Sequence, residues 1–110
     1  MSSTKISVIR PAELDLVPVE GNPLLRMSAN WTSEDGSRLV GAFGVAAGAD
    51  FEFEQALTEA MYIASGRITY TTPDGAQYDL KAGDFVQIDA GTAIKVKSEE
   101  DSTGFFIMLQ

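Results

Sequence analysis

Short stretches in which apolar and polar residues alternate, separated by turn-forming residues, recur along this chain. Alternation with a period of two is typical of a strand with one buried and one exposed face, and Ile94-Lys95-Val96-Lys97 shows it clearly. Turn signals such as Glu34-Asp35-Gly36, Lys81-Ala82-Gly83-Asp84 and Ala90-Gly91 recur every eight to twelve residues. This rhythm predicts an all-β fold of short antiparallel strands.

The predicted strands are the segments between the turns, which are rich in β-branched and aromatic residues. They are residues 5–9, 24–31, 38–45, 51–54, 61–64, 67–72, 77–80, 85–88, 93–97 and 105–109. Pro73-Asp74-Gly75 predicts a hairpin that joins two of them, because glycine adopts a positive φ without strain. We expect one short turn at 11–14 and an irregular connection at 18–23.

The stretch 52–66, EFEQALTEAMYIASG, is ambiguous on its own. Its residues are strong helix formers, and Leu57 and Met61 stand four apart, as one face of a helix requires. A lone helix in the middle of a barrel would have little to pack against, so the surrounding strands outweigh this local preference. We therefore interpret the stretch as strand.

Length and charge bound the possible functions. The 110 residues suit one domain, with an N-terminal strand and connection in 1–23 and a barrel in 24–110. The net charge of -8 disfavours binding to nucleic acid or to anionic lipid. The start MSSTKISVIRPAEL lacks the apolar core of a secretory signal, and the longest apolar run, residues 39–49, is too short to cross a membrane. These features predict a cytoplasmic protein.

The chain contains no histidine and no cysteine. Disulfides, imidazole or thiolate metal ligands and Ser-His-Asp arrangements are therefore excluded. Acid-base chemistry would have to use Asp, Glu, Lys or Tyr. A metal ion would find only oxygen ligands, which suit magnesium, calcium or manganese. We predict no metal and no cofactor.

Glycine and glutamate spacings in the second half of the chain resemble the two motifs of the cupin superfamily. The first motif runs G-x5-H-x-H-x3,4-E-x6-G, and Glu59 with Gly66 keeps its E-x6-G part, while Glu52-Phe53-Glu54 stands where H-x-H belongs. The second runs G-x5-P-x-G-x2-H-x3-N, and Gly83 with Gly91 keeps its glycines. There Asp89, Ile94 and Ser98 replace the Pro, His and Asn. The resemblance covers about 40–109 and implies a jelly-roll β-barrel.

Within the superfamily, the chain is similar to the histidine-poor branch that contains the ethanolamine-utilisation Q protein. It is also similar to the modules grouped with ureidoglycine aminohydrolase, through the Thr-Pro-Asp-Gly hairpin. The first resemblance implies a compact dimer and an acetate kinase activity, and the second implies amide or amine chemistry at a metal. We carry over the fold and neither reaction, because a fold does not fix a function.

The resemblance also implies that Glu52, Glu54 and Glu59 face one cavity. Three converging carboxylates would bind a hard cation, or one of them would hold a proton with a raised pKa and act as general acid or base. In the alternative, Glu52 and Glu54 lie in water at the barrel mouth and only Glu59 is buried. In the catalytic version, Tyr62 or Tyr70 supplies a hydroxyl.

Other residues are candidates for the cavity wall or for pairing with an acidic group. Ile94 and Val96 would make one wall apolar, either as a ligand surface or as plain core. Strand parity would add further lining from Trp31, Met61, Phe85, Gln87, Phe106 and Met108. Arg26 and Arg38 are candidates for pairing with an acidic ligand or a cavity Glu, and surface positions for both are the alternative.

The resulting hypothesis is a cupin barrel that binds a small organic molecule without the usual histidine metal ligands. It has an enzymatic version, a metal-free lyase, isomerase or cyclase step that uses Glu59. The alternatives are a non-catalytic binding or assembly module and an oxygen-ligand metalloenzyme. We also expect a homodimer, through an N-terminal segment around Ile6 and Ile9 and through outward aromatics such as Phe51 and Phe53.

Overall fold

The described part of the chain consists entirely of strands and their connections. The computed structural model describes residues 6, 8, 10 and 15–109, without the side chains of 29–31. In this part the strands are β1 (Val17–Val19), β2 (Asn22–Thr32), β3 (Arg38–Val45), β4 (Asp50–Glu54), β5 (Thr58–Ser65), β6 (Arg67–Thr71), β7 (Gln77–Lys81), β8 (Phe85–Ile88), β9 (Ala93–Ser98) and β10 (Ser102–Leu109). The all-β prediction is confirmed, and the ambiguous stretch 52–66 holds the end of β4 and all of β5.

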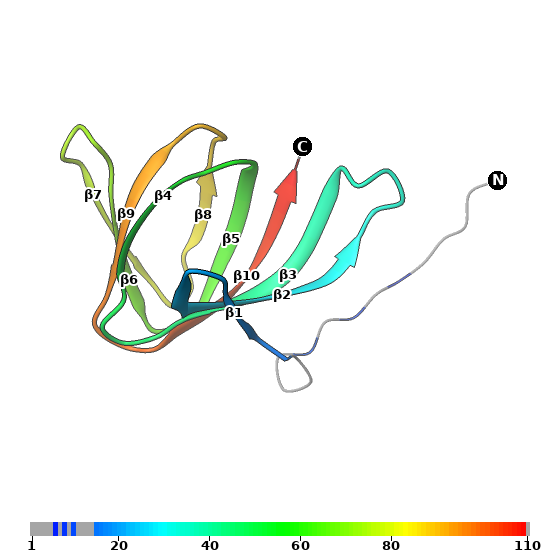
Figure 1. The fold of residues 1–110 in the computed structure, drawn as a ribbon, viewed down its shortest axis with the longest axis horizontal. Helices are drawn as coiled ribbons and strands as arrows, with labels where there is room; N and C mark the ends of the chain where they lie inside the picture. The colour runs from blue at the N-terminus through cyan, green and yellow to red at the C-terminus, as the bar shows by residue number, and fades with distance from the viewer. Residues whose placement is uncertain (1–5, 7, 9, 11–14, 110) are drawn as a thin grey trace.

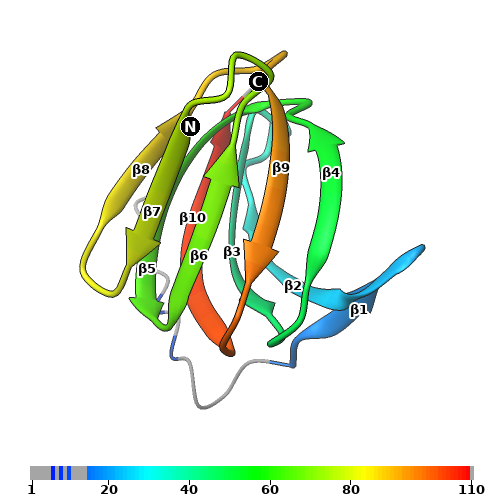
Figure 2. The same cartoon turned by 90° about the vertical axis from the view of Figure 1, so that its left-hand side faces the viewer.

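Two antiparallel sheets form the jelly roll. One has the strand order β1-β2-β3-β10-β5-β8 and the other β4-β9-β6-β7. The sheets curve towards each other, and in the turned view β7, β6, β9 and β4 stand in front of the larger sheet (Figures 1 and 2). Many strands that are neighbours in a sheet, such as β3 and β10 or β4 and β9, are far apart in the sequence, as the jelly roll implied by the cupin resemblance requires.

The core lies between the two sheets and follows the predicted alternation. In β9, Ile94 and Val96 are buried and Lys95 and Lys97 are exposed. The buried apolar cluster draws on both sheets: Phe43, Val45, Ala49, Met61, Ile63, Ile68, Leu80, Ile88, Ile94, Val96 and Phe106. Burial of this apolar surface is the main force that holds the sheets together.

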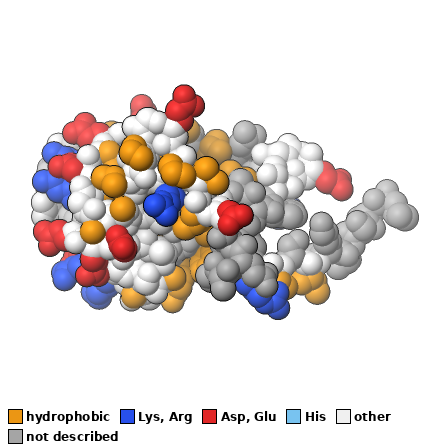
Figure 3. Space-filling model, turned by 60° about the horizontal axis from the view of Figure 1, so that its bottom comes forward, with side chains coloured by type: hydrophobic (Ala, Val, Ile, Leu, Met, Phe, Trp, Pro, Cys, Tyr) orange, Lys and Arg blue, Asp and Glu red, His pale blue; other side chains and the backbone are white. Residues whose placement is uncertain are grey.

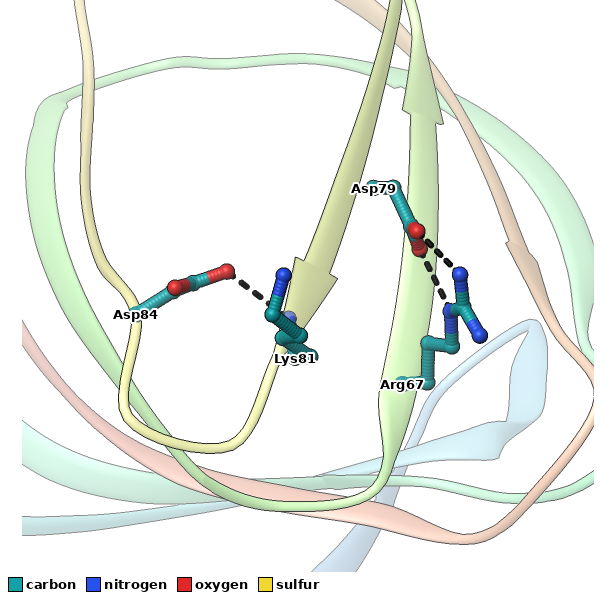
Figure 4. A network of polar contacts seen from close by, with 4 residues as sticks. All are labelled: Arg67, Asp79, Lys81 and Asp84. Atoms are coloured by element: carbon teal, nitrogen blue, oxygen red, sulfur yellow. Dashed lines mark hydrogen bonds and ion pairs between the residues drawn. The ribbon is translucent and has the colours of Figure 1, made fainter.

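The predicted hairpin at residues 73–75 is confirmed. It joins β6 to β7, and the backbone N–H of Gly75 donates to the carbonyl of Thr72 at 2.9 Å, with Gly75 at a φ of 88°. Arg67 on β6 forms a two-pronged ion pair with Asp79 on β7, and nearby the carboxylate of Asp84 accepts the backbone N–H of Lys81 (Figure 4). Because Arg67 and Asp79 are both exposed, their ion pair adds little stability.

The N-terminal third differs from the prediction in two places. Residues 18–23 are not an irregular connection, because β1 and β2 form a hairpin whose turn contains Gly21 at a φ of 80°. Pro18 fits in β1 because this strand is the edge of the sheet, where a missing N–H is tolerated. The strand predicted at 5–9 is wrong at Ile6 and Val8, which are exposed and outside any strand. The rest of that stretch and the predicted turn at 11–14 lie outside the described residues.

Two glycines lie where strands approach each other closely. A Cβ on Gly104 of β10 would collide with the carbonyl oxygen of Tyr62 and the ring of Phe43. A Cβ on Gly41 of β3 would collide with the carbonyl oxygen of Ser28 and contact the ring of Phe106. A side chain at either position would displace these neighbours, so both positions require glycine.

The outer face of the larger sheet is apolar near its centre. Phe85 of β8 pairs with Tyr62 of β5, which pairs with Phe105 of β10, and Ile107 and Leu109 continue the apolar surface along β10. In Figure 3, orange apolar side chains lie over the middle of the molecule with a few blue and red ones among them, whereas blue and red side chains are more numerous over the end that holds β6, β7 and β9. In the described part of the chain, no helix is long and apolar enough to cross a membrane.

Candidate functional site

A cavity of about 460 Å³ lies between the two sheets. Both sheets and the turn between β1 and β2 contribute to its wall. The lining residues are Val19, Glu20, Gly21, Asn22, Leu25, Met27, Phe43, Val45, Phe51, Glu52, Phe53, Glu54, Gln55, Ala56, Leu57, Glu59, Tyr70, Val96, Phe106 and Met108. Most of them are apolar, so the few polar groups in the wall stand out as possible contacts for a ligand.

Glu59 is the buried acidic residue of this wall. It lies on β5 opposite Met108 of β10 and Ile88 of β8, and only 7% of its surface is exposed. No group in the described part of the chain forms an ion pair with its carboxylate, and burial alone raises the pKa of Glu59 to about 7. At neutral pH this carboxyl group is therefore divided between its protonated and ionised forms.

Tyr70 places a hydroxyl group in the same wall. It lies on β6, opposite Val96 of β9, and its hydroxyl donates to the Sδ atom of Met61 at 3.7 Å. Burial and, to a smaller extent, the charge of Glu59 raise the pKa of the Tyr70 hydroxyl. Tyr70 therefore stays protonated at neutral pH and can act as a hydrogen-bond donor.

Gln55 is a wall residue that the sequence analysis missed. Its Nε2 donates to the carbonyl of Leu57 at 2.8 Å, while its Oε1 is buried without a hydrogen-bond partner among the described residues. A buried acceptor without a partner is costly and uncommon in native structures. The signal was present in the first cupin motif, which allows three residues before the Glu as well as four, and a spacing of three places Phe53 and Gln55 at the histidine positions.

The faces of β4 are the reverse of those predicted. Phe51 and Phe53 pair with the buried Val96 and Ile94 and pack against the core, so the expectation that these rings face outward is wrong. Glu52 and Glu54 are exposed and reach the cavity only at its rim. The physical reason is that opposite residues in an antiparallel ladder share a face, and aromatic rings gain more from burial than carboxylates do.

Convergence of Glu52, Glu54 and Glu59 on one point is therefore wrong, because only Glu59 is buried. Within the described residues, no three acidic side chains come together in a way that could hold a metal ion. At the second motif, the histidine position is Ile94, a core residue without a ligand atom. The side chains at the cupin metal positions thus do not fit a metal ion, and the oxygen-ligand metal site loses its geometric basis.

The predicted lining residues divide into three groups. Val96, Phe106 and Met108 lie in the cavity wall, whereas Met61 and Ile94 are buried in the core behind it. Phe85 and Gln87 are exposed, and placing them in the wall was wrong, because the inward residues of β8 are Val86 and Ile88. The side chain of Trp31 lies outside the description.

Three other predicted site residues lie away from the cavity. Tyr62 is 42% exposed on the outer face of β5, opposite Phe105 and Phe85, so its hydroxyl cannot serve this site. Arg26 and Arg38 are exposed and do not belong to the cavity wall, so pairing of either one with Glu59 is wrong. Tyr70 is therefore the tyrosine that accompanies Glu59.

The fold and the motif spacing define the class of protein. The sequence profile of the cupin domain family matches residues 43–109, which is more than half of the chain. The chain therefore belongs to the cupin family, as the motif spacing predicted. A comparison with curated protein sequences finds no match.

Within that family, the fold is like that of the ethanolamine-utilisation Q proteins. The protein from Salmonella typhimurium LT2 has a TM-score of 0.83 and 18% identity, with 94% of this chain and 85% of the other covered. EutQ of Clostridium difficile has a TM-score of 0.81 and 16% identity, with 94% and 86% covered. The cupin domain of Schizosaccharomyces pombe Cnp3 has a TM-score of 0.77 and 14% identity, with 96% and 75% covered. At such identities the likeness establishes the fold and no activity.

Proposed function

We propose that the barrel cavity binds a small organic molecule. The observation that carries this proposal is the cavity itself, with its apolar wall and the polar groups of Glu59, Gln55 and Tyr70 within it. Ligand sites are commonly concave, largely apolar and about 300–1,000 Å³ in volume, with a few polar groups that orient the ligand. We also propose a cytoplasmic location, because disulfides are rare in that reducing compartment and this chain has no cysteine to form one.

A second candidate function is proton transfer on the bound molecule. It is supported by Glu59, whose pKa of about 7 suits a general acid or base at neutral pH. Tyr70 would donate a hydrogen bond to an oxygen or nitrogen that gains charge during the reaction. This version is a metal-free lyase, isomerase or cyclase step, and its rival is a module that binds the molecule without changing it.

A thermal-shift screen tests the binding proposal directly. A ligand at a hundred times its dissociation constant should add about 2.7 kcal/mol to the free energy of unfolding. A cavity-filling variant, Val96→Phe, should lose the shift because the larger ring occupies the ligand volume. Equal shifts in the wild type and in a folded Val96→Phe variant would show that the ligand binds elsewhere.

Proton exchange separates the two candidate functions once a ligand is found. In deuterium oxide, an acid-base enzyme should exchange a carbon-bound proton of the ligand, which proton NMR detects as a lost signal. Glu59→Gln should stop this exchange while binding persists. Binding without exchange in the wild type would assign the chain to the non-catalytic module.

A further inference from the structure

The cavity wall carries acidic groups without basic ones. Glu59 lies within it, and Glu20, Glu52 and Glu54 lie along its rim. None of the described residues that line it is a lysine or an arginine. The chain as a whole carries a net charge of -8, so the electric field at the mouth of this cavity repels anions and attracts cations.

Aromatic rings form much of the remaining wall. Phe43, Phe51, Phe53, Tyr70 and Phe106 come from four different strands of the two sheets. The rings of Phe51 and Phe53 lie with their centroids 6.2 Å apart. The faces of aromatic rings attract cations, and this attraction strengthens where water is excluded.

Two acceptors in this wall lack the partner that a ligand could supply. The carboxylate of Glu59 has no ion-pair partner in the described part of the chain, and the Oε1 atom of Gln55 has no donor there. Both groups accept hydrogen bonds, and an ammonium group donates three without accepting any. The chemistry of the wall therefore matches a positively charged donor.

We propose that the ligand of this cavity is an organic cation with an apolar body, such as a primary amine, and that carboxylates and phosphate esters are excluded. This inference rests on the proposed function, because it requires that the cavity binds a small molecule at all. The ammonium group pairs with Glu59, and the apolar body packs against the aromatic wall. The acidic rim draws the cation in.

The pairing should depend on pH through Glu59. Its neighbours on β10 and β8, Met108 and Ile88, do not titrate, and Tyr70 on β6 stays protonated because its pKa is raised. The rim carboxylates Glu52, Glu54 and Glu20 complete the titratable groups that face the cavity. Since the pKa of Glu59 is about 7, affinity for an amine should rise about tenfold from pH 6 to pH 8.

Matched probes that differ only in their polar group test the inference. Isothermal titration at pH 8 would compare benzylamine, benzyl alcohol, toluene and benzoate, and a second series would carry the same groups on a cyclohexyl ring. We expect each amine to bind most tightly, at least tenfold tighter than the alcohol, and each carboxylate not to bind. The affinity of the alcohol should change little between pH 6 and pH 8.

Variants connect this preference to Glu59. Glu59→Gln should reduce amine affinity at least tenfold and abolish its pH dependence, while toluene binding stays unchanged. Glu99→Gln removes one charge from an exposed residue between β9 and β10 that is not part of the cavity wall, and it should leave all the affinities unchanged. Gln55→Leu should weaken the amine more than toluene, because it removes the acceptor that has no partner.

The possible outcomes separate the two proposals. If toluene, alcohol and amine bind equally well, or if benzoate binds best, the cavity binds ligands but the cation inference is overturned. If no compound of either series binds, the small-molecule proposal itself fails and the cation inference fails with it. Amine preference that survives in Glu59→Gln would also overturn the pairing, because the cation would then bind elsewhere.

Discussion

Glu59 on β5 and Tyr70 on β6 face the same cavity from opposite sheets, and the charge of the carboxylate helps to raise the pKa of the tyrosine hydroxyl. The hydroxyl therefore keeps its proton throughout the range in which Glu59 titrates. The pair offers one group that changes its charge near pH 7 and one that does not. Such a division lets the cavity alter its charge while it keeps a fixed hydrogen-bond donor.

The first prediction concerns the stability of Glu59→Gln. Burial raises the folded-state pKa of Glu59 from 4.5 to about 7, so wild-type stability should fall as the pH rises from about 4.5 to 7 and then level off. Glutamine keeps the shape of the side chain and carries no charge. From pH 5 to pH 8, the free energy of unfolding of the wild type should therefore fall by about 2 kcal/mol relative to that of the variant.

Chemical denaturation of both proteins at the two pH values measures this difference. Glu99→Gln is the matched control, because its side chain is exposed, and it should show no comparable gain. A loss of about 3–5 kcal/mol in Glu59→Gln would instead show that the carboxylate is ionised and paired. Equal stability of variant and wild type at both pH values would mean that Glu59 is solvated.

The second prediction is a homodimer formed through the outer face of the larger sheet. Tyr62, Phe85, Ile107 and Leu109 expose apolar surface there, and such a surface commonly marks an interface. Phe51 and Phe53 cannot contribute, because they pack inside the barrel. Light scattering at micromolar concentration should give the mass of two chains.

Substitutions on the two sheets locate that interface. Ile107→Glu should yield monomers, whereas Tyr78→Glu, at an exposed tyrosine of the smaller sheet, should leave the dimer intact. Deletion of residues 1–10 tests the contribution expected from Ile6 and Ile9, and an undiminished dimer would remove it. A monomeric wild type would refute the dimer itself.

The third prediction concerns the close approach at Gly104. A Cβ there would collide with the Tyr62 carbonyl and the Phe43 ring, so Gly104→Ala should cost about 2–3 kcal/mol of stability or prevent folding. Gly36→Ala is the control, because no atom lies within 4 Å of its added Cβ. With a φ of 72°, Gly36→Ala should cost only about 1–2 kcal/mol. Denaturant midpoints that rank the two variants in the reverse order would contradict this packing.

The fourth prediction follows from the absence of histidine and cysteine. Purified protein should contain no stoichiometric zinc, iron, copper or nickel, since the chain has neither imidazole nor thiolate ligands. Elemental analysis by mass spectrometry measures this directly. One such ion per chain would overturn the argument and would require a site built from oxygen ligands alone.

The sequence predicted the strands well because turn residues and alternation act locally. The segment 38–45 matches β3 and 85–88 matches β8 at both ends. The resemblance to cupin motifs also predicted the fold, since the glycine spacing reflects where the chain turns. Residues 18–23 were misinterpreted, because two prolines and a glycine suggest an irregular segment unless the strand is known to lie at an edge.

The site was harder to predict, because it depends on which face of each strand points inward. Glu59 and Tyr70 were identified, whereas the choice between the two motif spacings placed Glu52 and Glu54 inside instead of Phe53 and Gln55. In β8, strand parity was expected to place Phe85 inside, but Phe85 pairs with the outward Tyr62. Parity of this kind follows from strand pairing, which a single sequence does not reveal.

The register of the β4–β9 ladder has an evolutionary consequence. It places Phe51 and Phe53 opposite Val96 and Ile94, and so fills one side of the barrel with rings. A slip of one residue would turn Glu52 and Glu54 inward without any substitution. In this architecture, a one-codon insertion or deletion next to β4 could therefore replace the aromatic rings on one side of the cavity with two further carboxylates in a single step.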